Sequence, residues 1–169
     1  MSEKSVNEAV SFGARLASSQ AFADLFRDGM ALVEETAAYL DGPGRQESKK
    51  LERAAALAYA TESMRLTTRL MQLASWLLLH RAVKEGEMSL AQANKEKAKV
   101  KLATSEHSDE QNIKLLPERL RALIQRSKVL QSAVRRLDAT IHAAVPTRID
   151  RGNPVERQLG LLKAAFERK

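Results

Sequence analysis

The 169-residue sequence contains no cysteine and has few aromatic residues, glycines and prolines. Without cysteine, the chain has no disulfide, no thiolate metal ligand and no cysteine nucleophile. Aromatic side chains make up 4 % of the sequence, and this scarcity weighs against the stacking platforms that bind single-stranded nucleic acid. No alternating strand pattern bounded by turn residues is present either.

Long hydrophobic runs are also missing. The most apolar segment, residues 74–79, is far shorter than the roughly 20 residues needed to cross a bilayer. The N-terminus has no basic region followed by an apolar stretch, so no signal peptide is visible. We therefore expect a soluble cytoplasmic protein.

The residues that are abundant are Ala, Leu, Glu, Arg, Lys and Gln, which lose little side-chain freedom in a helix. They predict an all-α fold. The net charge of +7 is unevenly distributed along the chain. Residues 1–42 hold three basic and seven acidic side chains, a net charge of −4. The other 127 residues hold 25 basic and 14 acidic side chains, a net charge of +11. Such a basic balance is compatible with nucleic acid, an anionic membrane or an acidic protein partner.

Capping and turn signals predict the first two helices. Ser18 and Ser19 are good N-caps for an amphipathic helix over about 19–40, on which Gly29 lies on the inner face and permits close approach of a neighbour. Asp41-Gly-Pro-Gly44 is a strong turn that returns the chain antiparallel. No Pro or Gly interrupts residues 46–83, so we predict one helix of about 55 Å there.

The middle of this second helix carries two neighbouring apolar rows. One row is Leu66, Leu70, Leu73 and Leu77, and the other is Met64, Met71, Ala74 and Leu78. Together they form an arc wider than one partner helix covers. We expect the first and third helices to cover both rows, leaving Trp76 and Leu79 for the tail or a second subunit.

A long connection follows the second helix. Gly86 ends the helix, and Ser89-Leu-Ala-Gln92 resembles a capping box for a short, charged, solvated helix to about residue 100. Residues 103–113 are interpreted as a polar loop. A connection of about 30 residues is either a functional surface or a tolerated insertion.

Pro117 and Glu118 begin the third helix. Its apolar positions alternate four and three residues apart, as coiled-coil packing requires: Leu116, Leu120, Leu123, Ser127, Leu130, Val134, Leu137 and Ile141. Off this seam lies a candidate basic face of Arg119, Arg126, Arg135 and Arg136. It is either an ordinary solvated face or a surface for an acidic partner.

The C-terminal segment forms a separate module. After Pro146 and a linker, Asn153 and Pro154 provide N-cap and first-turn signals. A candidate protein-binding row follows at Val155, Leu159, Leu162 and Phe166. A helix of about 14 residues is marginal in water, so it needs a partner, either its own bundle or another protein.

These elements predict an antiparallel three-helix bundle with long helices, a long, partly helical connection between helices two and three, and a tail with a short amphipathic helix. Residues 1–145 are assigned to the bundle domain, and residues 146–169 to the linker and tail.

Residues for catalysis or metal binding are not apparent in the sequence. His80, His107 and His142 lie in no HExxH or ExxH pattern. No phosphate-binding loop and no GxSxG elbow occurs. Glu62, Arg65 and Arg69 have the spacing of structural ion pairs along a helix. We expect a non-enzyme with no catalytic, cofactor-binding or metal residues.

Four long stretches are distinctive as a set: Ser11-Phe-Gly-Ala-Arg-Leu-Ala-Ser-Ser19, Phe22-Ala-Asp-Leu-Phe-Arg-Asp-Gly-Met30, Glu34-Glu-Thr-Ala-Ala-Tyr-Leu-Asp-Gly-Pro-Gly-Arg45 and Tyr59-Ala-Thr-Glu-Ser-Met-Arg-Leu-Thr-Thr-Arg-Leu-Met-Gln-Leu-Ala-Ser-Trp-Leu77. Two shorter ones are Gly86-Glu-Met-Ser89 and Leu115-Leu-Pro-Glu-Arg-Leu120. Together these stretches resemble the RcdA family, the regulators of CtrA degradation of alphaproteobacteria, and the resemblance covers nearly the whole chain.

The resemblance implies a homodimeric, non-enzymatic adaptor for the ClpXP protease. It implies docking on ClpX primed by a CpdR-type response regulator, and delivery of substrates such as CtrA, directly or with a PopA-type cyclic-di-GMP effector. Recruitment to a cell pole comes with that role. The alternative from charge alone is a basic, helical, nucleic-acid-associated protein, whose binding would weaken steeply with salt.

Overall fold

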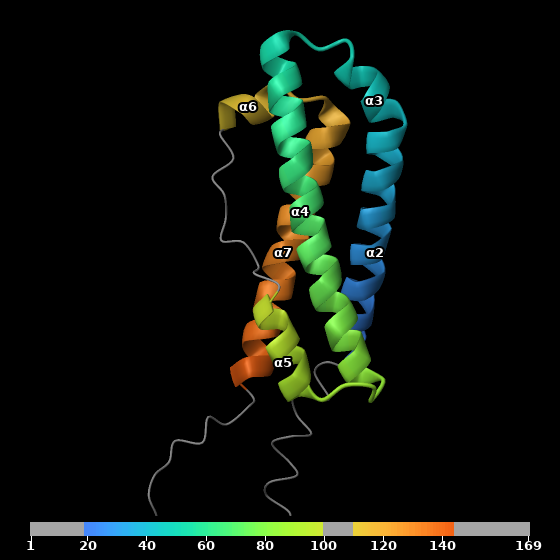
Figure 1. Ribbon diagram of the computed structural model, residues 1–169, viewed down its shortest axis with the longest axis vertical. Coiled ribbons are helices and arrows are strands. Elements are labelled where there is room, and N and C mark those ends of the chain that lie inside the picture. The colour runs from blue at the N-terminus through green and yellow to red at the C-terminus, as the bar shows by residue number, and fades with distance from the viewer. Residues whose placement is uncertain (1–18, 100–109, 144–169) are drawn as a thin grey trace, which may run out of the picture.

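The computed structural model describes residues 19–99 and 110–143, and within them every regular element is an α-helix. The three long helices are α2 (Gln20–Asp41), α4 (Arg53–Lys84) and α7 (Glu118–Ala143). The three short ones are α3 (Pro43–Ser48), α5 (Leu90–Lys99) and α6 (Glu110–Lys114). Figure 1 shows them as one elongated bundle, which confirms the all-α prediction.

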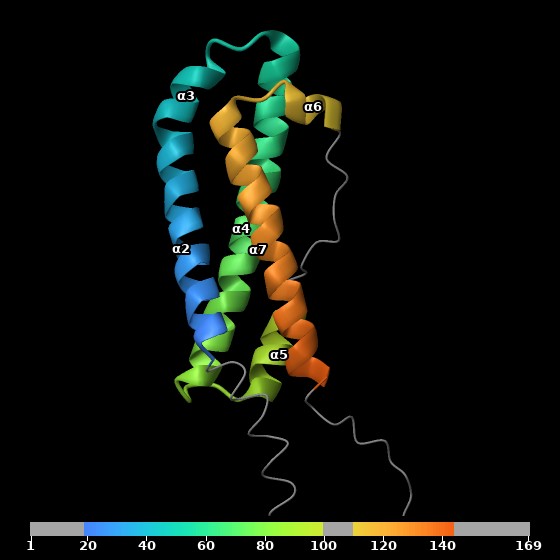
Figure 2. The same cartoon turned by 180° about the vertical axis from the view of Figure 1, so that it is seen from behind.

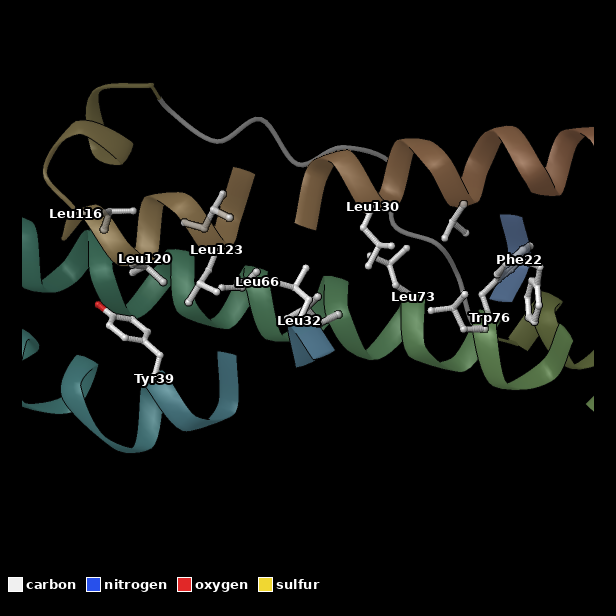
Figure 3. Close-up of a cluster of buried hydrophobic side chains, with 14 of the residues drawn as sticks. Phe22, Leu32, Tyr39, Leu66, Leu73, Trp76, Leu116, Leu120, Leu123 and Leu130 are labelled. Carbon is white, nitrogen blue, oxygen red and sulfur yellow. The ribbon is translucent and has the colours of Figure 1, made fainter. Parts of the chain in front are cut away.

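The long helices pack side by side around one hydrophobic core. Each contributes a stripe of apolar side chains, and Figure 3 shows these meeting along the length of the bundle. Gly29 of α2 lies where a Cβ would come within 2.6 Å of Leu77 Cδ1, as close approach of the two helices requires. The fully buried large apolar side chains are Phe22, Tyr39, Leu66, Leu73, Trp76, Leu77, Leu120, Leu123, Val134 and Ile141.

The directions of the helices differ in one respect from an antiparallel bundle. Side-chain contacts pair Arg69 with Ser127 and Trp76 with Asp138, so residue numbers rise together along α4 and α7. Glu35 pairs with Arg126, and Tyr39 lies under Arg119, so α2 is antiparallel to α7. Figures 1 and 2 show the same arrangement: α2 runs one way, and α4 and α7 both run the other.

This topology explains the long connection between α4 and α7. Two parallel neighbours require the chain to return along the whole bundle before α7 begins. At 1.5 Å per residue, the 32 residues of α4 span roughly 48 Å. In Figure 2, α5 lies beside the C-terminal end of α7, and α6 lies near the opposite end of the bundle. The connection is therefore a structural requirement of the parallel pair.

The predicted second helix is divided in the structure. Residues 43–48 form α3, and α4 begins only at Arg53, after Glu52 adopts an extended backbone with φ −65° and ψ 160°. No Gly or Pro marks this break, so it depends on tertiary contacts. The Tyr39 hydroxyl donates to Glu47 Oε2 at 2.6 Å, and Gly44 is buried against Tyr39 and Tyr59. These contacts hold α3 as a corner.

The connection between α4 and α7 contains the predicted capping box, but part of its predicted loop is helical. Ser89 N donates to Gln92 Oε1 at 3.0 Å, and Gln92 N donates to Ser89 Oγ at 3.1 Å, which is the predicted capping box before α5. Residues 110–113 were expected to be loop but belong to α6, where Ile113 packs against the core.

The seam predicted for α7 is confirmed. All of its positions are buried except Leu137, which is half-buried. The tail row, His107 and the proposed boundary between residues 145 and 146 lie outside the described residues.

Candidate interaction surfaces on the bundle

The largest exposed side chains of α4 form a row on the side of the helix opposite the core. Leu57, Met64, Met71 and Leu78 are 70, 72, 66 and 52 % exposed. They are spaced seven residues apart, so they follow one line along the helix and drift only about 20° per step. We call these four residues the outer row.

The exposed positions around the outer row carry no charge. Every exposed position of α4 from Ala54 to His80 is an uncharged residue, and these are Ala54, Leu57, Ala60, Thr61, Met64, Thr67, Thr68, Met71 and Leu78. The exposed face of a helix in water normally carries charged side chains. A strip of exposed apolar and uncharged side chains is a candidate interaction site.

The structure corrects the prediction that both apolar rows of α4 are covered. Leu66, Leu70, Leu73 and Leu77 are buried as expected, but Met64, Met71 and Leu78 are exposed, because α2 and α7 both pack on the same side of α4. Trp76 was expected to remain available for a further neighbour. It is 1 % exposed and packs against Phe22, with ring centroids 6.2 Å apart.

A polar cluster surrounds Trp76 at the end of the bundle. Trp76 Nε1 donates to Asp138 Oδ1 at 2.9 Å, and Lys97 of α5 contacts the other carboxylate oxygen. His80 is fully buried and stacks on Trp76 with ring centroids 3.9 Å apart. Lys97, expected to be solvated, therefore joins α5 to the bundle.

Burial and hydrogen bonding set the pKa values in this cluster. Burial raises the pKa of Asp138, but the hydrogen bonds from Lys97 and Trp76 outweigh it and leave the pKa below its ordinary value. Burial lowers the pKa of His80 and outweighs the hydrogen bond to the Trp76 carbonyl, which raises it. His80 Nε2 has no hydrogen-bond partner among the described residues, so the neutral ring, with Nδ1–H donating to Trp76 O at 3.0 Å, fits the site.

The candidate basic face does not form one continuous surface. Arg126 donates to Glu35 of α2 at 2.6 Å, and Arg119 lies 5.3 Å from the Tyr39 ring centroid. Arg135 is nine residues beyond Arg126, which is two and a half helical turns, so the two project from opposite sides of α7. Arg135 and Arg136 are exposed. Two of the four arginines therefore contribute to α2–α7 packing as well as to the surface.

The ion-pair prediction inside α4 is confirmed for Glu62 and Arg65. Buried Glu62 contacts Arg65 at 2.7 Å. Arg69 donates to Ser127 Oγ at 2.9 Å, and Ser127 Oγ donates to Ile124 O at 2.7 Å. This contact gives the polar position in the α7 seam a structural partner across the core.

Two features are absent from the part of the chain that the structure describes. In 19–99 and 110–143, no group of three or more His, Asp or Glu side chains has the geometry to hold a metal ion. Within the same ranges, no helix is long and apolar enough to span a bilayer.

The fold and these surfaces define a helical-bundle protein with a strip of exposed, uncharged side chains along α4. A family model described as "Protein of unknown function (DUF1465)" matches residues 13–166. The solved structure of RcdA from Caulobacter crescentus CB15 is similar, with 52 % sequence identity and a TM-score of 0.60, over 76 % of this chain and 96 % of that chain. No curated protein matches. The chain belongs to the RcdA family.

Proposed function

We propose that this protein is a non-enzymatic adaptor that delivers regulatory proteins to the ClpXP protease. The observation that carries the proposal is the 52 % identity to RcdA over 96 % of that chain. Within this proposal, the partners are ClpX primed by a CpdR-type response regulator, a PopA-type cyclic-di-GMP effector, and substrates such as CtrA. The adaptor works as a homodimer in the cytoplasm, is recruited to a cell pole and needs no cofactor.

The physical features of the bundle support this function. An adaptor raises the local concentration of a substrate at a protease, so it needs separate binding surfaces on a rigid frame. The core of α2, α4 and α7 is such a frame. The uncharged face of α4 and the exposed arginines of α7 lie on different helices and can therefore serve different partners.

The tail row of Val155, Leu159, Leu162 and Phe166 is the candidate docking element of the adaptor. Its apolar positions fall on one face of a helix by spacing alone. A short amphipathic helix of this kind binds in an apolar groove of a partner. In this role it would act as a tether between the bundle and the protease or its substrate.

Reconstituted degradation tests the proposal. Substrate loss by ClpXP is measured with the primed protease, alone and with the full-length protein. We expect faster loss with the protein, and slower delivery when Leu162→Glu and Phe166→Glu are combined or the chain is truncated after Ile149. Ala164→Glu, half a turn away from the row, is the matched control. No acceleration by the full chain would contradict the adaptor function, and unchanged delivery by the tail variants would contradict the role of the tail.

A nucleic-acid-associated function is the second candidate, favoured by the +11 charge balance of residues 43–169. A gel-shift experiment at moderate salt separates the two, because non-specific binding to phosphates weakens steeply as salt rises. Absence of a retained complex would discard this candidate.

A further inference from the structure

We propose that the exposed face of α7 binds an acidic helix of a partner protein. The proposal rests on the proposed adaptor function, because it gives the chemical class of one protein that the adaptor gathers. It concerns a face that neither the core of the bundle nor the outer row of α4 uses. Three observations carry it: the spacing of the exposed residues of α7, a row of cations beside them, and the charge of the neighbouring helix α2.

The residues along the middle of this face have the spacing of a second helix-packing seam. Their intervals alternate three and four residues, as coiled-coil packing requires. All six of them are exposed, and they are Ala122, Gln125, Val129, Ser132, Arg136 and Ala139. We call these six residues the outer seam of α7. Four of them have short side chains, so a partner helix can approach α7 closely.

A row of cations follows the outer seam on the flank of α7 away from α2. Arg121, Lys128 and Arg135 are spaced seven residues apart, and each directly precedes a member of the outer seam. We call these three residues the cation row. Positions that flank a seam in this way carry the interhelical ion pairs of coiled coils and set the choice of partner. Neither Arg121 nor Lys128 forms an ion pair with residues 19–99 or 110–143.

The rest of the exposed face of α7 adds no negative charge. After Glu118, no exposed position of this helix is acidic. Asp138 is half-buried and is already held by Trp76 and Lys97. With six basic and two acidic side chains, α7 has a net charge of +4. The complementary partner is a helix with Glu or Asp at seven-residue spacing beside its own seam.

The cation row disfavours a second copy of this chain as the occupant. Two α7 helices packed through their outer seams would bring cations opposite cations, because both copies carry the same row. Like charges placed against each other exclude a partner as effectively as attraction selects one. The outer seam therefore favours a different, acidic protein.

The charge of α2 disfavours nucleic acid. A helix in the major groove of a duplex has a phosphate strand along each flank. One flank of α7 lies against α2, whose five acidic side chains and one basic side chain give a net charge of −4. Glu35 of α2 contacts Arg126 there at 2.6 Å. A single helix about 10 Å wide avoids these carboxylates, because it can contact the outer seam and the cation row alone.

A designed peptide tests the proposal in the absence of the protease. The probe is a fluorescein-labelled helix of about three heptads, with Leu and Ala in its seam and Glu at the flanking positions. Fluorescence anisotropy measures its binding to the full-length protein at about 0.1 M salt. A peptide of the same composition in scrambled order and a duplex DNA of about 20 base pairs are measured in parallel. We expect the heptad peptide to bind at least about tenfold more tightly than either.

Charge reversal locates the binding face. Arg121→Glu combined with Lys128→Glu should weaken binding of the Glu peptide at least about tenfold and should gain binding to the same peptide with Lys in place of Glu. Lys49→Glu combined with Lys50→Glu is the matched control, since it reverses two exposed cations outside α7 and changes the net charge equally. The control should bind the Glu peptide as the native chain does. Circular dichroism verifies that both double variants keep their helices.

Four outcomes would overturn the proposal. No binding of the heptad peptide would leave the outer seam without the predicted partner. Equal binding of the ordered and scrambled peptides, or equal losses in the α7 variant and the control, would show that net charge alone drives the contact. Tighter binding of the duplex would show a nucleic-acid surface. Degradation by ClpXP is a separate measurement, so a failure of the adaptor function is distinguishable from a failure of this surface.

Discussion

The two sides of α4 both carry rows of large apolar side chains, yet these rows have opposite environments. On the inner side, Leu66, Leu73 and Leu77 are at most 1 % exposed between α2 and α7. On the outer side, Met64 and Met71 are about two-thirds exposed. Hydrophobic burial stabilises a fold only when a partner covers the side chain. The inner side therefore stabilises the single chain, and the outer side is expected to stabilise an assembly.

The largest loss of folding stability is expected for a substitution on the inner side of α4. Trp76→Ala removes a buried ring that packs on Phe22 and His80 and donates to Asp138. We expect the free energy of unfolding to fall by about 3–5 kcal/mol, the range for large aromatic deletions from a core. Urea unfolding followed by circular dichroism measures it. A loss below about 1 kcal/mol would contradict the placement of Trp76.

A smaller loss is expected for Asp138→Ala. This variant leaves the Trp76 N–H and the Lys97 ammonium without their acceptor in a partly buried site, which costs about 1–3 kcal/mol. It also detaches α5 from α7. Hydrogen exchange should therefore accelerate in α5 more than in α2, and equal acceleration in both helices would count against the proposed anchoring.

The inner side also predicts a pH dependence through His80. Its pKa is lowered in the folded chain, so the unfolded chain takes up the proton first as pH falls. The stabilisation is complete above the ordinary histidine value of about 6.5 and is lost as pH falls towards the folded pKa. We expect the native chain to lose stability between pH 7 and pH 5 more steeply than His80→Phe. Parallel curves for the two proteins would refute this assignment. Asp138 adds to the pH dependence of stability only at lower pH, because the pKa of its carboxyl in the folded chain lies below the ordinary value.

The smallest effect on folding is expected at the outer side. Met71→Ala removes an exposed side chain, so the unfolding free energy of the monomer should change by no more than about 0.5 kcal/mol. Measurement at a protein concentration low enough to dissociate dimers isolates this effect. A loss comparable to that of Leu73→Ala would mean that Met71 is covered within the single chain.

Local signals in the sequence predicted much of the fold. The caps at Ser19 and Ser89, the end of α2 at Gly42 and the α7 seam all concern residues close in the chain, and each is present. The predicted turn over residues 41–44 is wrong beyond Gly42, because Pro43 and Gly44 belong to α3. The parallel direction of α4 and α7 was not predictable, because turn length fixes direction only across short connections. The break before Arg53 depends on the distant partners Tyr39 and Tyr59.

The interaction surfaces were harder to predict. An apolar row on a helix looks the same in sequence whether another helix of the chain covers it or not, so Met64 and Met71 were assigned to the core. The buried cluster of Trp76, His80, Lys97 and Asp138 joins three helices, and no local motif brings those residues together. The roles of the basic residues and the tail row stay predictions.

Sedimentation equilibrium of the native chain and Met71→Glu, from about one to one hundred micromolar, tests most directly whether the outer side of α4 assembles the protein. The native chain is predicted to rise from the mass of one chain towards the mass of two. Met71→Glu is predicted to remain at one chain, or to need at least about tenfold more protein, because a carboxylate at the interface must lose its water. Identical dissociation constants for the two proteins would contradict this role of the outer row.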